Sequence, residues 1–250
     1  MRIFQNILAI LRAILLILMM VFYLLGYVLT RIIWKHTRSS GLRLRKAYIR
    51  YTAYPILNLK VKVEGKPFDG PALYVCNHRT FSDPIVISKY LNAFVIAKAE
   101  VANYPIINKG AEATGIIWVQ RTDKESRTNA RKAFVDVVKG GHNILVYPEG
   151  TISTTKSTLS FKKGTFLEAA KEGLTVVPVA IEYRSKKDLW LIPNIVGQYL
   201  NAFGKWKTEA KLSFGTPMKM EDGVQLAEEC EQWINDEIEK MQEGWSNMGF

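Results

Sequence analysis

The residues best suited to catalysis lie in one short block, where a histidine precedes an aspartate by five positions. His78 and Asp83 follow an apolar run, residues 72–76, and Pro84 comes next. Five positions leave two side chains about 140° apart on a continuous helix, so a strand, a loop and a new helix are needed to bring them together. Pro84 suits the first position of such a helix, which makes Asp83 its expected N-cap.

This corner predicts acid–base chemistry. One oxygen of Asp83 caps the helix, and the other accepts a hydrogen bond from the ring of His78. That bond fixes the imidazole tautomer and leaves the second ring nitrogen free to take a proton from a hydroxyl. An ordinary N-cap beside an incidental loop histidine gives the same spacing, so the block needs support from elsewhere in the chain.

A second block supplies that support. Residues 143–147 form another apolar run, which opens into the sequence Pro-Glu-Gly-Thr at residues 148–151. Together with Asn77, His78 and Asp83, this block resembles the glycerolipid acyltransferase family, specifically the 1-acyl-glycerol-3-phosphate acyltransferases. That family carries N-H-x-x-x-x-D and, downstream, an apolar strand ending in P-E-G-T.

Two further blocks match the same family in the expected order. Residues 115–121 resemble its strand that delivers an arginine, and residues 176–181 resemble its strand with an internal proline. The resemblance extends over residues 59–214, and four ordered blocks make it specific.

The resemblance implies transfer of a fatty-acyl group from a thioester of acyl carrier protein or coenzyme A. The acceptor would be the 2-hydroxyl of 1-acyl-glycerol-3-phosphate, and the product phosphatidic acid. His78 would be the general base, oriented by Asp83, and would return the proton to the leaving thiolate. No acyl-enzyme is required, because the acceptor oxygen takes the part of a catalytic serine. A route through Ser82 or Thr80 as nucleophile stays open.

The resemblance also implies which residues bind the acceptor. Arg121 is expected to bind its phosphate, because a planar guanidinium pairs with two phosphate oxygens at once. The remaining expected contacts come from the Pro-Glu-Gly-Thr block: Glu149, Gly150 and Thr151. Lys98 and Lys162 are further candidates, because they could supply positive charge that departures from the family's pattern remove.

Two positions depart from the family's pattern in this acceptor region. Ile152 follows the Pro-Glu-Gly-Thr block where the family often has arginine, and Gln120 stands where aspartate is frequent. Glycerol 3-phosphate or another lysophospholipid therefore remains an alternative acceptor. A different class, a non-enzymatic membrane lipid-binding protein, would leave His78 and Asp83 dispensable.

The elements that must position these residues follow from the apolar patterns. β-Branched runs predict seven strands at residues 59–64, 72–76, 93–97, 115–119, 143–147, 175–182 and 209–214. Apolar residues at helical spacing predict an amphipathic helix between the fourth and fifth strands, and further helices are expected from Pro84, around Tyr104, near Lys163 and after Asp222. The pattern predicts an α/β domain over residues 59–250, with a mixed, mostly parallel sheet flanked by helices. Ligands of such sheets lie outside the carboxyl ends of the strands.

Residues 1–58 have a different character, which predicts an N-terminal apolar and basic two-helix membrane element. Residues 13–29 are uncharged and apolar, and a segment rich in Lys, Arg, Trp and Tyr follows. Such a pair is typical of membrane interfaces. The pattern fits either a spanning helix or insertion into one leaflet. The basic flank and two isolated cysteines predict a cell-membrane protein with its catalytic domain on the cytoplasmic face.

The net charge of +11 lies entirely within residues 1–63, the N-terminal quarter of the chain. Residues 1–63 contain eleven Lys and Arg and no Asp or Glu, while the remaining 23 basic and 23 acidic residues cancel. A nucleic-acid enzyme spreads basic residues over its folded domain. Charge beside an apolar segment instead predicts an anionic membrane surface as partner and no nucleic acid. No cofactor is expected, and the three histidines at 36, 78 and 142 lack metal-ligand spacing.

Overall fold

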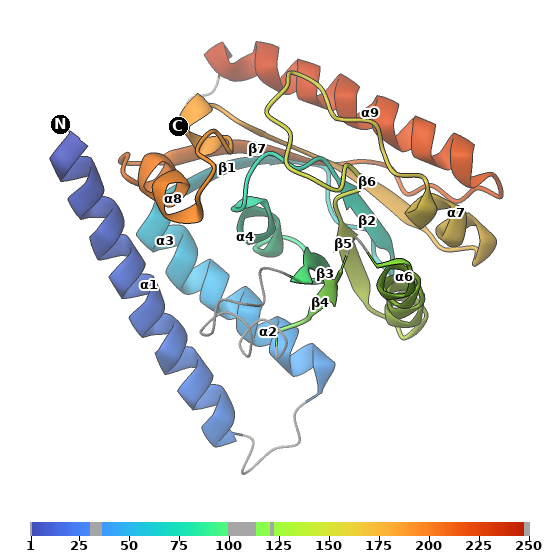
Figure 1. The fold of residues 1–250 in the computed structure, drawn as a ribbon, viewed down its shortest axis with the longest axis horizontal. Helices are drawn as coiled ribbons and strands as arrows, with labels where there is room; N and C mark the ends of the chain where they lie inside the picture. Colours follow the sequence, from blue (N-terminus) through green and yellow to red (C-terminus); the bar gives the residue numbers. More distant parts are fainter. Residues whose placement is uncertain (1, 31–36, 100–113, 121–122, 248–250) are drawn as a thin grey trace.

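A seven-stranded sheet forms the centre of the molecule (Figure 1). The computed structural model describes residues 2–30, 37–99, 114–120 and 123–247. The strands are β1 (Leu59–Glu64), β2 (Leu73–Cys76), β3 (Ala93–Lys98), β4 (Ile116–Val119), β5 (Asn143–Val146), β6 (Val176–Tyr183) and β7 (Thr208–Phe214). Their order is β1-β7-β6-β2-β5-β3-β4, and only β6 and β7 pair antiparallel. The predicted mixed, mostly parallel sheet is therefore confirmed.

Both faces of the sheet are covered, which explains why its central strands read as continuous apolar runs. Every residue of β2 and β6 is buried. One face packs against α6 (Lys124–Lys139), α7 (Gly164–Lys171) and α9 (Gly223–Glu243). The other face packs against α4 (Asp83–Ser88), α8 (Ile195–Phe203), the π-helical turn η1 (Ile49–Ala53) and α3 (Tyr54–Leu57). The helix expected around Tyr104 lies outside the described residues.

The amphipathic helix predicted between the fourth and fifth strands is α6. Its N-cap is Asp123, whose carboxylate accepts hydrogen bonds from the backbone N–H groups of Glu125 and Ser126. Its buried face includes Phe134 and Val138. Two short 3₁₀ turns complete the described elements, η3 (Lys186–Asp188) and η4 (Gly244–Asn247).

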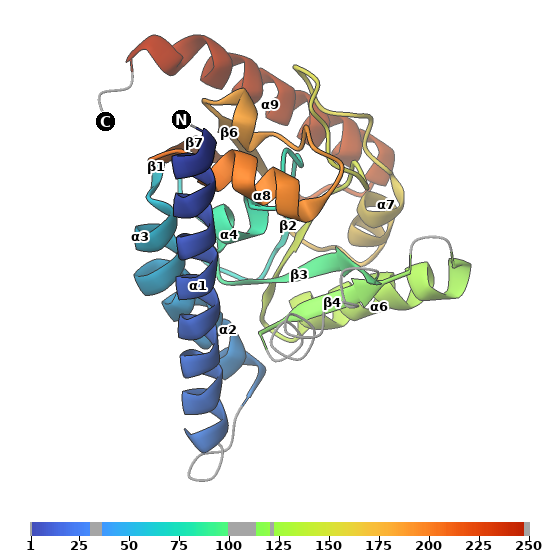
Figure 2. The ribbon, with the colours of Figure 1, turned by 60° about the vertical axis from the view of Figure 1, so that its left-hand side comes forward.

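The N-terminal helix α1 (Arg2–Thr30) lies along the outside of the domain, beside α8, α3 and α2 (Arg38–Tyr48) (Figures 1 and 2). It is long and apolar enough to cross a membrane, judged by length and composition. Fourteen large apolar side chains between Ile3 and Leu29 are exposed, so most of its surface has no protein neighbour. This exposed apolar face indicates association with a membrane.

One buried charge fastens α1 to the domain. Arg12 donates hydrogen bonds to the backbone carbonyls of Phe203, Lys205 and Trp206 at 2.9, 2.7 and 2.8 Å. The hydroxyl of Tyr48 on α2 also donates to the carbonyl of Leu16, at 2.9 Å. The helix is therefore bonded at two points to the rest of the molecule.

Candidate functional site

The histidine and aspartate predicted from the sequence lie side by side at the carboxyl end of β2. His78 Nδ1 is 2.7 Å from Asp83 Oδ2. The side chain of Asp83 is fully buried, whereas that of His78 retains 16% of its accessible surface. The imidazole thus has one nitrogen held from inside the protein and an edge that a substrate can reach.

The hydrogen bonds of Asp83 differ from those predicted. Ser82 is the N-cap of α4 and Asp83 is its first residue, so the expected capping role of Asp83 is wrong. Its Oδ2 accepts from the backbone N–H groups of Arg79 and Thr80 at 2.7 and 3.0 Å, and its Oδ1 accepts from the hydroxyl of Tyr183 at 2.8 Å. These donors converge on the carboxylate because the loop curls back around it. They stabilise its negative charge in a buried place.

Asn77 fixes the start of this loop. Its side chain donates to the carbonyl of Ile181 at 2.9 Å and accepts from the N–H of the same residue at 2.8 Å. The amide therefore continues the pairing between β2 and β6 beyond the end of β2. As a result, His78 begins from a rigid point of the sheet.

Arg79 is fully buried, and no sequence pattern predicted its role. Its guanidinium donates to Glu182 Oε2 at 2.9 Å and to the carbonyls of Thr155 and Lys156 at 2.5 and 3.1 Å. Gln242 on α9 also donates to Glu182 Oε2, at 2.9 Å. The ion pair ties the loop after β2 to β6, and the two carbonyl bonds tie it to the loop that follows the Pro-Glu-Gly-Thr block.

Glu149 joins the same two loops through its carboxylate. Its Oε1 accepts from the backbone N–H of His78 at 2.7 Å, and its Oε2 accepts from that of Leu159 at 2.8 Å. Burial raises the pKa of Glu149, and these two N–H donors oppose that shift. The structure thus bonds Glu149 to the backbone of His78. Its predicted contact with the acceptor stays a prediction.

The other residues predicted to bind the acceptor lie in different surroundings, and some lie outside the described part of the chain. Gly150 has a φ of +72°, and a Cβ there would collide with the Nζ of Lys162, which crosses directly over it. Thr151 is exposed. Lys98 ends β3, with a side chain outside the described part, and Arg121 lies outside the described residues altogether.

Gly150 and Lys162 share a pocket of about 320 Å³ with Tyr147 and Arg131. One lining residue connects the pocket to His78, because the ring of Tyr147 stacks on the ring of His78 with centroids 4.1 Å apart and planes 20° apart. Lys162 and Arg131 give the pocket two cationic side chains. Arg131 was not predicted, since on its own helix it reads as an ordinary surface residue.

Comparison with known proteins decides the family. A family model described as Acyltransferase matches residues 58–182, half of the chain. The chain belongs to the acyltransferase family. The resemblance seen in the sequence blocks is thereby confirmed.

Relatives with assigned activities match this acyltransferase over its central part. The chloroplastic 1-acyl-sn-glycerol-3-phosphate acyltransferase LPAT1 of Arabidopsis thaliana is 32% identical over 139 residues, covering 54% of this chain and 39% of the relative. A lyso-ornithine lipid O-acyltransferase of Rhodobacter capsulatus is 32% identical over 133 residues, covering 51% of this chain and 48% of the relative. The chain thus spans less than half the length of these two relatives.

A solved structure matches nearly the whole acyltransferase. The crystal structure of the 1-acyl-sn-glycerophosphate acyltransferase PlsC from Thermotoga maritima superimposes with a TM-score of 0.76 at 25% sequence identity. The match covers 99% of this chain and 100% of the other. The shared fold therefore includes the N-terminal helices as well as the sheet.

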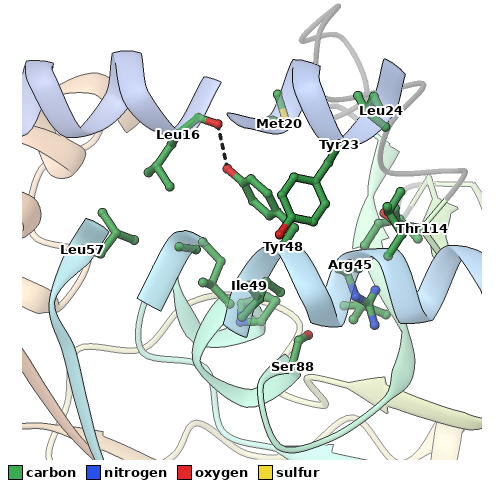
Figure 3. A pocket seen from close by; sticks show the side chains of 16 residues that line it. Leu16, Met20, Tyr23, Leu24, Arg45, Tyr48, Ile49, Leu57, Ser88 and Thr114 are labelled. Carbon is green, nitrogen blue, oxygen red and sulfur yellow. Dashed lines mark hydrogen bonds between the residues drawn. The ribbon is translucent and has the colours of Figure 1, made fainter. Parts of the chain in front are cut away.

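The acyltransferase has a second pocket, of about 300 Å³, which the sequence did not predict. It lies between the N-terminal helices and the sheet, with Leu16 and Tyr23 from α1 on one side and Ile49 on another (Figure 3). Pro84 and Ile85, which follow Asp83, also line it. Its walls are almost entirely apolar. The start of α4 therefore borders an apolar cavity directly after Asp83.

Proposed function

We propose that this acyltransferase moves a fatty-acyl group from a thioester to the 2-hydroxyl of 1-acyl-glycerol-3-phosphate and so produces phosphatidic acid. The observation that carries the proposal is the 2.7 Å contact between His78 Nδ1 and Asp83 Oδ2, beside which the imidazole keeps 16% of its accessible surface. The donor is acyl carrier protein or coenzyme A. Relatives that carry out this reaction on the same acceptor support the choice.

In the proposed mechanism, His78 Nε2 accepts the proton of the acceptor hydroxyl while its oxygen attacks the thioester carbonyl. Asp83 holds the Nδ1 proton and stabilises the imidazolium that forms. When the tetrahedral intermediate collapses, the carbon–sulfur bond breaks and His78 returns the proton to the thiolate. The acyl group is then an ester of the acceptor, and the enzyme is unchanged.

Burial of the nearby hydroxyls favours this direct transfer over an acyl-enzyme. Ser82 and Thr80 are 3% and 0% exposed. The Ser82 hydroxyl faces that of Tyr183 at 3.4 Å. Neither oxygen is placed to attack a thioester that approaches the exposed edge of His78.

The two pockets supply complementary binding sites for the substrates. The polar pocket, with Lys162 and Arg131, suits the phosphate of the acceptor, and Gly150 lets the chain pass beneath Lys162 without a side chain in the way. Arg121, Glu149, Thr151 and Lys98 remain proposed contacts. The apolar pocket suits an acyl chain.

The N-terminal helices place this chemistry at a lipid surface. Residues 1–58 would form the membrane-binding unit and residues 59–250 the catalytic domain, on the cytoplasmic face of the cell membrane. If α1 crossed the bilayer, the contacts of Arg12 would draw Lys205 and the end of α8 into the hydrocarbon layer at a high free-energy cost. We therefore infer that α1 lies in one leaflet, with its exposed apolar face among the lipid chains.

Another lysolipid is a second candidate acceptor. Two lyso-ornithine lipid O-acyltransferases match this chain, at 32% and 33% identity. Ornithine lipids carry an amino-acid head group in place of glycerol phosphate, so this alternative predicts that the cationic pocket contributes little to binding.

The test is acyl transfer by the purified protein in detergent, with a labelled acyl thioester and a panel of acceptors. The panel holds lysophosphatidate, glycerol 3-phosphate, lysophosphatidylcholine and lyso-ornithine lipid. We expect the highest kcat/KM with lysophosphatidate, and a loss of about 10²- to 10⁴-fold in His78→Ala. Preference for lyso-ornithine lipid would replace the proposed acceptor. Full activity in His78→Ala would reject the mechanism, and inactivity with the whole panel would leave the lipid-binding alternative.

A further inference from the structure

The connection between β6 and β7, residues 184–207, exposes more large apolar side chains than its surroundings do. This β6–β7 segment contains η3, α8 and the loops beside them. Outside α1, the most exposed large apolar side chains of the described residues are Trp206 at 74%, Tyr51 at 68%, Val196 at 66% and Leu191 at 54%. Three of these four belong to the β6–β7 segment. A single exposed apolar side chain is ordinary, whereas several in one segment indicate an interaction surface.

The apolar side chains at the start of α8 lie together because the preceding loop folds back on the helix. The side-chain oxygen of Gln198 accepts hydrogen bonds from the backbone N–H groups of Leu191 and Ile192 at 3.0 and 3.1 Å. The side chain of Ile192 reaches Gly197, where a Cβ would come within 2.9 Å of it. Leu191 and Val196 therefore belong to one exposed patch.

The other end of α8 meets the N-terminal helix. Gly204 follows α8 directly, and a Cβ there would lie 2.9 Å from the carbonyl oxygen of Gln5 on α1. The carbonyl of Trp206 accepts a hydrogen bond from Arg12 of the same helix. Both views of the molecule show α8 beside α1 (Figures 1 and 2). The β6–β7 segment is thus continuous with the helix whose exposed apolar surface indicates a membrane.

The charge of the catalytic domain is polarised between its two sides. Residues 64–250 carry no net charge, yet the β6–β7 segment contains five Lys and Arg and one Asp, a net charge of +4. The helix α9 contains seven Asp and Glu and one Lys, and it packs on the opposite face of the sheet from α8. An anionic surface would attract the side that holds α1 and α8 and repel the side that holds α9.

Two of the five cations are available to an anionic partner. Arg184, Lys205 and Lys207 each lie within 2.6–3.2 Å of a carboxylate of the same domain. Lys186 and Lys187 are exposed, and neither forms an ion pair within the described ranges of the chain. Exposed lysines beside a tryptophan and aliphatic side chains are typical of a surface that lies at the head groups of a bilayer.

We propose that the β6–β7 segment is a second membrane contact of this protein. Leu191, Val196 and Trp206 enter the lipid surface, and Lys186 and Lys187 bind the phosphates of anionic head groups. The bilayer is favoured over a protein partner because the segment joins the exposed apolar face of α1 and shares its positive charge. With α1 alone, the molecule could rotate about the helix axis; a second contact fixes the side of the domain that faces the lipid.

This contact bears on catalysis because the segment touches the loop after β2, which holds the catalytic pair. The backbone N–H of Trp190 donates to the carbonyl of Arg79 at 3.2 Å. The ring of Phe81 packs edge-on against the rings of Trp190 and Phe203, with centroids 5.8 and 5.9 Å apart. A bilayer bound to the β6–β7 segment therefore lies close to the loop that must receive a lipid acceptor.

The test measures lipid contact at single sites of the full-length protein, in vesicles of phosphatidylcholine with and without phosphatidylglycerol. A fluorophore is attached to Leu191→Cys, Val196→Cys or Trp206→Cys, and its quenching by a lipid with a nitroxide on the acyl chain is recorded. The native cysteines are buried, and the unsubstituted chain gives the background of labelling. Leu18→Cys on the exposed face of α1 is the positive control, and Val224→Cys, an exposed valine on α9, is the matched negative control. We expect quenching at all three sites and none at Val224→Cys.

A second arm tests the charge. Lys186→Gln with Lys187→Gln, in the labelled Val196→Cys protein, should lower the affinity of the segment for the anionic surface by roughly 30-fold. Quenching should then fall to the level found without phosphatidylglycerol. The matched control is Lys171→Gln with Lys240→Gln, two lysines that are 70% exposed on α7 and α9. This control should leave quenching unchanged, because α7 and α9 cover the other face of the sheet.

Kinetics then separate the membrane contact from acyl transfer itself. Leu191→Ser with Val196→Ser should raise the KM for lysophosphatidate in vesicles by roughly 10-fold, because apolar contact with the lipid surface is lost. The KM and kcat for a short-chain, water-soluble lysophosphatidate should stay at their wild-type values. A wild type inactive with both acceptors would refute the proposed acyl transfer, whereas the quenching results do not depend on activity.

Three results would overturn the second membrane contact. One is quenching at Leu191→Cys and Val196→Cys no stronger than at Val224→Cys. Another is an equal loss of quenching in the control pair of lysines. The third is a patch that binds a second copy of the chain: the labelled sites would then be shielded from lipid, and Val196→Ser would lower the molecular mass of the protein in detergent.

Discussion

Replacement of Asp83 by asparagine tests how much of the catalysis depends on a single buried charge. Asparagine has the same shape, and its oxygen can accept from His78 and the two backbone N–H groups while its NH₂ donates to Tyr183. The hydroxyl of Tyr183 can rotate to accept that bond. The fold should therefore survive, and the change removes mainly the negative charge.

The size of the effect follows from the geometry. With charge centres about 4 Å apart and an effective dielectric constant of about 20, the carboxylate stabilises the imidazolium by about 4 kcal/mol. A factor of ten in rate corresponds to about 1.4 kcal/mol, so kcat should fall by about a thousandfold. KM should change little, because the imidazolium forms only as the reaction proceeds.

The assay is steady-state acyl transfer to lysophosphatidate by wild type, Asp83→Asn, His78→Ala and the double variant. Because the two side chains act as a unit, the double variant should be no slower than His78→Ala. Activity in Asp83→Asn within about tenfold of wild type would refute the calculation. Losses that multiply in the double variant would refute the idea that Asp83 acts through His78.

Three further predictions concern stability and binding. Arg79→Met leaves the buried Glu182 without its cation and should lower the free energy of unfolding by about 3–5 kcal/mol in denaturant titrations; no change would mean that the pair is not shielded from water. Gly150→Ala should raise the KM for the acceptor and lower the free energy of unfolding by about 1–2 kcal/mol, because alanine at this position must adopt a positive φ and its Cβ meets Lys162. Unchanged kinetics would exclude Gly150 from the binding pocket. Asp188 has a pKa raised to about 6 by burial, so the folded state binds its proton more tightly than the unfolded chain does. This tighter proton binding stabilises the fold below about pH 4, and the stabilisation, up to about 3 kcal/mol, is lost as the pH rises through 6. The free energy of unfolding of the wild type, minus that of Asp188→Asn, should therefore fall between pH 4 and pH 6. A difference that does not change with pH would disprove the raised pKa.

The sheet could be predicted from the sequence because its signal is local. Each strand is a short apolar run bounded by turn residues, and each observed strand begins and ends within one residue of its predicted bounds. The helix α8 gave no such signal. It has only nine residues with Gly197 inside it, so it is too short for the helical repeat to stand out from the sequence around it.

The site could be predicted only in part. His78 and Asp83 are near in sequence, and their pairing follows from one strand–loop–helix corner. The partners of Arg79 and Asn77 lie about a hundred positions away, at Glu182 and Ile181, and no local pattern connects them.

The bonds of Arg12 also bear on how the protein is made. Its three carbonyl partners lie 191 to 194 positions further along the chain. At about 5–20 residues per second, a ribosome needs roughly 10–40 s to reach them after Arg12 has been added. Throughout that time the α1 segment carries a charge that has no partner, which opposes its entry into lipid. We therefore expect the α1 segment to take its final place beside the domain only after the end of α8 has been made and folded.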